Sequence, residues 1–244
     1  MNRLLPVILL LAAVAAFPNA PAERCSDNAD VRGIPLIELP ANRVTAKHHR
    51  FAIMLTGDGG WRRIDVRVTN RFRAEGIPVV GFITPDYYRT TRSADESACA
   101  LERTIRFYKA LWKCDRVLVI GYSRGADILP FMLSRLPAEV RGSIDVVALL
   151  GLEPTIDFRY HPSWIPFYHP KEPQFAVLPE MEKLRDYRIL CFYGEKEKDS
   201  LCHALDPQMA TIIREHGSHH FAGNYSGIAE AILRAASEVA VDAP

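Results

Sequence analysis

The chain has 244 residues, 48% of them hydrophobic, and its formal net charge is +1. This length and hydrophobic content favour one α/β domain with a sizeable core. Nucleic-acid binding needs a basic excess on one face, and the balanced charge gives no sign of one, so no nucleic-acid partner is predicted.

The first 22 residues are typical of an export signal. A basic residue precedes an apolar run from Leu4 to Phe17, and Ala20–Ala22 has the small-residue spacing of a cleavage site. The run is short for a membrane span, which needs ~20 residues. We therefore expect residues 23–244 to form a single exported domain, most simply in a bacterial periplasm. Cleavage after Ala16 and an uncleaved membrane anchor are the alternatives.

Apolar runs and helical periodicity alternate in the first half of the chain. Ile34–Leu39 predicts a short edge strand, and Phe51–Leu55 predicts a core strand. A glycine-rich loop follows the core strand and runs to Trp61. A helix over Ile64–Glu75 and a strand over Ile77–Ile83 come next.

A long helix and a sharp turn come next. The helix is predicted to start at a capping box of Ser93 and Glu96 and to end at Trp112. The apolar run Val117–Ile120 predicts a buried strand, which leads into Gly121-Tyr-Ser-Arg-Gly125, a G-x-S-x-G pentapeptide.

A helix from Ala126 to Leu136 follows the pentapeptide. Strand, tight turn and helix is the setting in which G-x-S-x-G forms a nucleophile elbow. A side chain two residues before or after the serine would collide with the neighbouring strand or helix. Ser123 is therefore the candidate nucleophile, and a plain strand-to-helix turn is the alternative.

The last third of the chain predicts three more strands, over Ser143–Leu150, Tyr187–Tyr193 and Met209–Glu215, and a closing helix over Ser226–Val239. Between them, Pro154–Pro179 is rich in proline and aromatic residues and is long for an ordinary connection. We interpret it as a cap over the site or as a loop packed on the scaffold. The alternation of strands and helices predicts a mostly parallel sheet with helices on both faces, as in the α/β-hydrolase fold.

Nucleophile, acid and base occur in the chain order of that fold, as Ser123, Asp199 and His219. A serine hydroxyl is a poor nucleophile at neutral pH and needs a base that a carboxylate orients. His220 is the second choice for the base. The same loop as Asp199 holds three other candidate acids, Glu195, Glu197 and Asp206.

The glycines of the loop after Phe51–Leu55 leave backbone N–H groups open to close approach. In a serine hydrolase of this layout, that loop and the residue after the nucleophile supply the oxyanion-hole N–H groups. A flexible turn is the alternative reading of the loop. The candidate oxyanion and substrate-binding residues are Gly57, Asp58, Gly59, Gly60, Arg124 and Asp127.

Five cysteines fit an oxidising compartment and leave at least one unpaired. Cys191 and Cys202 are the best candidates for a bridge, which would brace the loop that holds the acid. Cys99 and Cys114 lie at opposite ends of one predicted helix and are not expected to pair. There is no metal-ligand spacing and no dinucleotide fingerprint, so no metal and no cofactor are predicted.

Several motifs together resemble the bacterial virulence protein family of VirJ and AcvB. They are Leu55–Trp61, Ile77–Gly81, Trp112, Gly121–Pro130 and Gly217–Phe221. The resemblance covers nearly the whole mature chain and implies a periplasmic α/β-hydrolase. AcvB-type members imply hydrolysis of lysyl-phosphatidylglycerol to lysine and phosphatidylglycerol, and VirJ members imply a link to type IV secretion and virulence.

Carried over to this chain, the resemblance implies Ser123 as nucleophile, Asp199 and His219 as its partners, and Gly57–Gly60 as the oxyanion loop. A lysyl group carries ammonium charges and favours nearby carboxylates. Three aspartates flank the two loops and could supply them or be structural instead: Asp58, Asp65 and Asp127. The aromatic segment could touch a membrane surface. A generic carboxylesterase or thioesterase and a non-catalytic secretion adaptor are the alternatives.

Overall fold

The computed structural model describes Cys25 and residues 30–42, 49–160 and 174–241. The predicted export signal lies outside the described residues, as does the middle of the proline-rich segment, residues 161–173. None of the described helices is both long and apolar enough to cross a bilayer.

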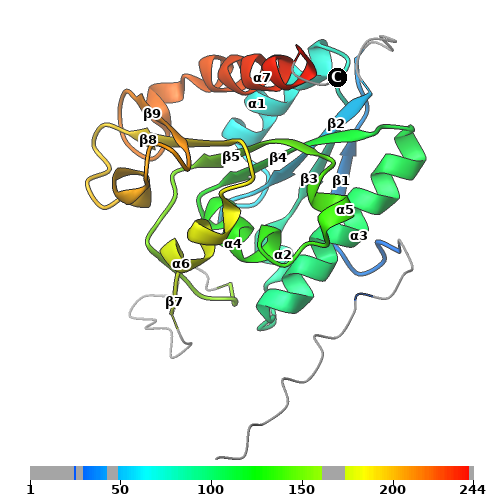
Figure 1. Ribbon diagram of the computed structural model, residues 1–244, viewed down its shortest axis with the longest axis horizontal. Coiled ribbons are helices and arrows are strands. Elements are labelled where there is room, and N and C mark those ends of the chain that lie inside the picture. Colours follow the sequence, from blue (N-terminus) through cyan, green and yellow to red (C-terminus); the bar gives the residue numbers. More distant parts are fainter. Residues whose placement is uncertain (1–24, 26–29, 43–48, 161–173, 242–244) are drawn as a thin grey trace, which may run out of the picture.

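Seven strands form one sheet in the order β1-β3-β2-β4-β5-β8-β9 (Figure 1). β1 pairs antiparallel with β3 at one edge, and every other pairing is parallel. The predicted mostly parallel sheet with a short edge strand is thus confirmed. The strands are β1 (Leu36–Leu39), β2 (Arg50–Leu55), β3 (Val79–Phe82), β4 (Arg116–Tyr122), β5 (Ile144–Leu150), β8 (Ile189–Gly194) and β9 (Thr211–Glu215).

Helices cover both faces of the sheet (Figure 1). Alternate side chains of β2 show why: Phe51 and Ile53 enter the core on one face, and Ala52 and Met54 enter the core on the other. α1 (Arg63–Ala74) and α7 (Tyr225–Val241) pack on the second face. α3 (Ala94–Trp112) and α4 (Arg124–Leu133) pack on the first, together with α2 (Thr84–Tyr87), α5 (Ala138–Arg141) and α6 (Leu178–Met181).

The predicted start of one helix agrees with the structure, and that of another differs by two residues. The Ser93 hydroxyl accepts a hydrogen bond from the N–H of Glu96, and the Glu96 carboxylate accepts one from the N–H of Ser93, so the capping box of α3 is confirmed. α4 begins at Arg124, two residues earlier than predicted, because the turn at Ser123 leads directly into the helix.

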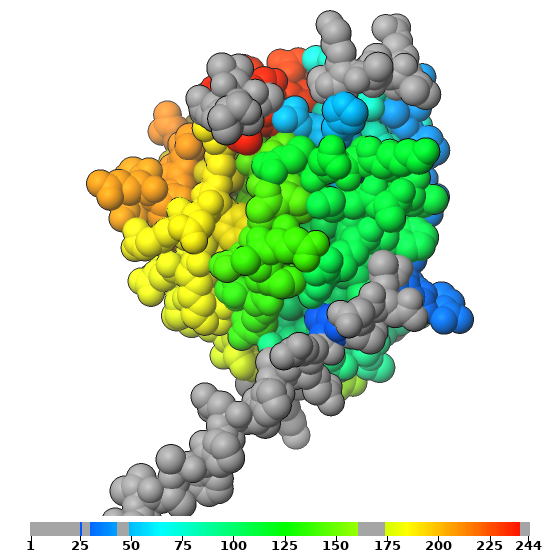
Figure 2. Space-filling model, turned by 45° about the vertical axis from the view of Figure 1, so that its right-hand side comes forward, coloured from blue at the N-terminus to red at the C-terminus, as the bar shows by residue number. Residues whose placement is uncertain are grey.

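The segment between β5 and β8 is irregular. β6 (Thr155–Ile156) and β7 (Phe175–Ala176) form a two-stranded antiparallel pair, and the 3₁₀ helix η1 (Glu182–Leu184) follows α6. α6 is fastened to α4 by the Ser134 hydroxyl, which donates to Glu180 Oε2 at 2.6 Å. Figure 2 shows the yellow surface of the residues around β8 beside the green surface of the middle of the chain.

Two disulfide bonds brace the described chain. The predicted bridge between Cys191 of β8 and Cys202 of η2 (Leu201–Ala204) is confirmed, and it closes the loop that follows β8. A second bridge joins Cys25 to Cys99 and fastens the segment around Cys25 to α3. Cys114 is buried as a free thiol, in keeping with the odd number of cysteines.

Candidate active site

Ser123 lies at the sharp turn between β4 and α4, with φ of 53° and ψ of −126°. This is a backbone conformation that costs a non-glycine residue of order 1–3 kcal/mol. The flanking glycines make the turn possible. A Cβ on Gly121 would lie 2.4 Å from the carbonyl oxygen of Gly125, and a Cβ on Gly125 would lie 2.4 Å from that of Leu55. The sequence prediction of an elbow-type turn is therefore met in its geometry.

The glycine-rich loop after β2 passes directly beside Ser123. A Cβ on Gly57 would lie 3.1 Å from the Cβ of Ser123, so a larger residue would crowd Ser123. The backbone hydrogen bonds of the described residues include none donated by the N–H groups of Gly57, Asp58 or Gly59. The N–H of Arg124 lies in the first turn of α4, where helical N–H groups lack intrahelical acceptors. These donors are free to bind a developing negative charge.

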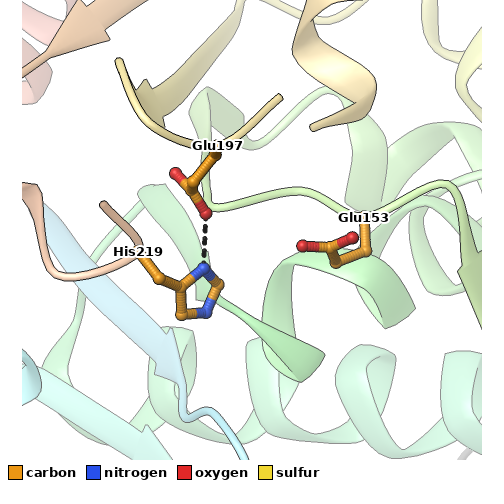
Figure 3. A group of neighbouring side chains, drawn as sticks. All are labelled: Glu153, Glu197 and His219. Carbon is orange, nitrogen blue, oxygen red and sulfur yellow. Dashed lines mark hydrogen bonds and ion pairs between the residues drawn. The ribbon is translucent and has the colours of Figure 1, made fainter. Parts of the chain in front are cut away.

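His219 follows β9 and forms a short hydrogen bond with Glu197, which follows β8. His219 Nδ1 and Glu197 Oε1 are 2.6 Å apart (Figure 3). The second carboxylate oxygen of Glu197 accepts the N–H of Gly194 at 2.5 Å. Burial opposes ionisation, but these hydrogen bonds lower the pKa of Glu197 below its ordinary value. The carboxylate is thus held ionised beside the imidazole.

The structure puts Glu197 where the sequence predicted Asp199. The turn after β8, in which the N–H of Glu197 donates to the carbonyl of Gly194, directs Glu197 back toward the sheet edge. Asp199 is exposed instead. Of the candidate acids in this loop, Glu197 is the one that faces His219, because a turn in the loop reverses the direction of the chain.

His219, rather than His220, is the histidine that contacts the carboxylate. His220 is exposed, and its Nδ1 lies 2.9 Å from the hydroxyl of Tyr122. The His219 ring is packed closely against Gly151, where a Cβ would lie 2.6 Å from Cε1 of the imidazole. Gly151 also has a φ of 69°, so both space and backbone conformation require glycine there.

One cavity of about 450 Å³ brings most of the predicted residues together. Ser123 and His219 line the same space as the glycine-rich loop, although the strands that they follow, β4 and β9, are far apart in sequence. The cavity is lined by Gly57, Asp58, Gly59, Gly60, Arg62, Arg63, Ile64, Tyr122, Ser123, His219, His220 and Tyr225.

The side chain of Arg124 is buried and paired with two carboxylates. Its Nε donates to Asp58 Oδ1, and its Nη1 donates to Asp157 Oδ1 at 3.3 Å and to the Asp157 carbonyl at 3.0 Å. Arg124 is 8% exposed, so these partners compensate a largely desolvated charge. The guanidinium therefore does not act as an unpaired cation beside Ser123, and Asp58 is committed to it.

Asp127 and Asp65 are also held by the scaffold, which favours the structural alternative for both; Asp127, a candidate substrate-binding residue, does not line the cavity. Asp127 is 4% exposed, and its Oδ1 accepts the N–H of Glu153 at 2.7 Å; burial raises its pKa well above the ordinary value. Asp65 is fully buried, and its Oδ2 accepts the N–H of Arg62 at 2.8 Å.

Replacing Asp65 with asparagine should flatten the pH dependence of stability. Burial raises the pKa of Asp65 from 3.8 to about 6. The folded state therefore binds more protons than the unfolded state between these pH values, and the free energy of unfolding falls as pH rises through this window. We expect Asp65→Asn to gain of order 2 kcal/mol over wild type at pH 8 and little at pH 4. Urea unfolding at both pH values measures this, and parallel pH profiles would contradict it.

Glu153 is a site residue that the sequence prediction missed. It follows β5, and its carboxylate points toward the His219 ring (Figure 3). One polar atom each of Glu153, Glu197 and His219 lies within 4.8 Å of the others, a spacing at which they could also hold a metal ion. Burial, and then the charges of Glu197 and Asp199, raise the pKa of Glu153, while His219 lowers it. Its position after a parallel strand is the one signal that pointed to it.

Known structures share this architecture at low sequence identity. Est1E from Butyrivibrio proteoclasticus matches with a TM-score of 0.59 and 14% identity, over 85% of this chain and 97% of that one. MenH from S. aureus matches with a TM-score of 0.56 and 13% identity, over 84% and 98%.

XC6422 from Xanthomonas campestris, described as an α/β serine hydrolase without a lid, matches with a TM-score of 0.51 and 14% identity, over 83% and 88% of the two chains. These likenesses confirm the α/β-hydrolase fold. No curated protein matches the sequence. The family described as bacterial virulence protein (VirJ) matches residues 49–240, most of the chain, and the protein therefore belongs to the VirJ family and has the α/β-hydrolase fold.

Proposed function

We propose that this protein is a periplasmic serine esterase that hydrolyses lysyl-phosphatidylglycerol to lysine and phosphatidylglycerol. The observation that carries the proposal is the shared cavity of Ser123 and His219, with His219 hydrogen-bonded to an ionised Glu197. A serine, an imidazole and an orienting carboxylate are the parts that ester hydrolysis by a nucleophilic serine needs.

In the proposed mechanism, Ser123 Oγ attacks the ester carbonyl carbon while His219 Nε2 takes the hydroxyl proton. Glu197 holds the proton on Nδ1 and stabilises the imidazolium. The N–H groups of Arg124 and the Gly57–Gly60 loop bind the oxyanion. Collapse breaks the ester C–O bond, and His219 returns the proton to the departing alcohol. Water then attacks the acyl-serine by the same route and releases the free acid.

Glu153 supports a cationic acyl group. Its carboxylate faces His219, and among the described residues its side chain has no hydrogen bond or ion pair. Its backbone is fixed because Asp127 accepts its N–H. A fixed, unpartnered carboxylate beside the acyl position suits an ammonium group, since charge-assisted hydrogen bonds are the stronger ones. The pairing of Arg124 with Asp58 and Asp157 removes an unpaired positive charge that would repel such a substrate.

The test is lysine release from vesicles that contain lysyl-phosphatidylglycerol, with wild-type protein and Ser123→Ala. We expect release by wild type and none above background by the variant. Vesicles of phosphatidylglycerol alone provide the blank. Absence of release by wild type, or equal release by both proteins, would overturn the assignment of this substrate.

The location and partners belong to the same proposal. The export signal in residues 1–22 supports a periplasmic protein, and a lipid substrate requires at least transient contact with a membrane surface. Components of a type IV secretion system are candidate protein partners, and no nucleic-acid partner is proposed.

Two other functions remain to be separated from this one. A generic carboxylesterase or thioesterase would turn over short acyl esters and ignore the lysyl lipid. A non-catalytic adaptor on a hydrolase scaffold would leave Ser123 unlabelled by a fluorophosphonate.

A further inference from the structure

The wall of the cavity formed by the start of α1 is basic. Arg62 and Arg63 both line the space that holds Ser123, and both are exposed. Among the described residues, neither guanidinium has an ion pair. Asp58 is the one carboxylate in the lining, and Arg124 already holds it. The cavity lining therefore presents two arginines without an ion-pair partner, although the buried carboxylate of Asp65 offsets part of the charge of Arg62.

A backbone hydrogen bond and a contact with the glycine-rich loop position the side chain of Arg62. Its N–H donates to Asp65 Oδ2, which anchors the residue at the N-terminal end of α1. Its side chain then folds back over Gly59: a Cβ on that glycine would lie 3.1 Å from Nε of Arg62. The aliphatic part and Nε of Arg62 thus lie against the glycine-rich loop, and Arg62 lines the same cavity as Ser123.

We propose that Arg62 and Arg63 form an anion subsite that binds a phosphate on the alcohol side of the ester substrate. The planar guanidinium presents paired N–H donors that match phosphate oxygens, and the N-terminal end of α1 adds a favourable dipole. Glu153 does not line this cavity but lies near His219, which does, so a substrate with a cationic acyl group and an anionic alcohol would meet a carboxylate near His219 and guanidinium groups at the start of α1. The inference rests on the proposed esterase activity and adds which part of the substrate the arginines select.

Two matched soluble esters test the subsite: 1-acetylglycerol 3-phosphate and the neutral 1-acetylglycerol. The double variant Arg62→Gln/Arg63→Gln keeps the backbone N–H that caps α1 and removes both charges. We expect it to lose ~10-fold or more in kcat/KM on the phosphate ester, mainly through KM, because hydrogen bonds to charged groups are strong. For the neutral ester, kcat/KM should change by no more than about twofold, because this substrate has no phosphate for the arginines to bind.

Arg67→Gln is the matched control, since Arg67 is an exposed arginine of α1 that does not line the cavity. It should leave both esters unaffected. The preference of wild type for the phosphate ester should also shrink as salt is added. Equal losses of the double variant on both esters, or no loss on either, would overturn the subsite.

A binding measurement separates this inference from the proposed function. Inorganic phosphate is titrated by calorimetry into Ser123→Ala protein with and without the two arginine substitutions, so no turnover is needed. Weaker binding in the triple variant supports the subsite even if lysyl-phosphatidylglycerol is not a substrate. Equal binding to both proteins, or none to either, would overturn it. The titration of glycerol 3-phosphate in parallel distinguishes a headgroup from free phosphate as the preferred source of the anion.

Discussion

Replacement of Ser123 by alanine is expected to abolish ester hydrolysis, with a loss in kcat of ~10⁵-fold or more. The substitution removes the oxygen that we propose attacks the carbonyl carbon, and it leaves the backbone turn and the flanking glycines unchanged. Hydrolysis of a neutral phenyl ester measures the loss, and covalent labelling by a fluorophosphonate reports the nucleophile directly. Thermal unfolding should show a folded protein.

Ser226→Ala is the control for this experiment. Ser226 is exposed on α7 and does not line the cavity, so both labelling and turnover should persist. If Ser123→Ala protein still hydrolysed the ester, or still carried the label, a nucleophilic role for Ser123 would be wrong. The adaptor function would gain support if wild type failed to label.

The second large effect is a difference in kcat between variants of Glu197 and Asp199, which shows which of the two carboxylates acts with His219. Glu197→Gln keeps a hydrogen-bonding oxygen near His219 but replaces a carboxylate by a neutral amide, which favours the wrong tautomer and no longer stabilises the imidazolium. We expect kcat to fall ~10²- to 10⁴-fold, in the range seen when such an acid is neutralised. Asp199→Asn should change kcat by no more than about twofold. Steady-state kinetics of both variants on one ester measure the difference.

The opposite result would contradict the assignment of Glu197. A large loss in Asp199→Asn with little effect in Glu197→Gln would restore the assignment made from sequence. The pH dependence of stability provides an independent test of the interaction between Glu197 and His219. The lowered pKa of Glu197 means that its stabilising contribution is present above the ordinary carboxyl pKa and is lost as pH falls through the lowered value. Glu197→Gln should therefore lose stability at neutral pH and converge with wild type in acid.

The sequence alone determined the architecture and the nucleophile candidate, because these depend on local patterns. Continuous apolar runs such as Phe51–Leu55 predict strands that are buried on both faces, and β2 is such a strand. The Ser93–Glu96 capping box marked a helix start that the structure reproduces. The pentapeptide around Ser123 predicted a sharp turn because only glycine fits at its two outer positions, and the close approach of Gly121 to Gly125 shows the steric reason.

Only the tertiary structure decided which charged side chains meet. Loop residues a few positions apart are equivalent in sequence, but a single turn after β8 directs Glu197 to His219 and leaves Asp199 in solvent. Glu153 reaches the same histidine because the ends of parallel strands converge at one edge of the sheet. Arg124 forms ion pairs with Asp58 and Asp157, which lie far apart in the chain. Charge pairing and burial depend on the positions of distant segments, and no local pattern encodes those positions.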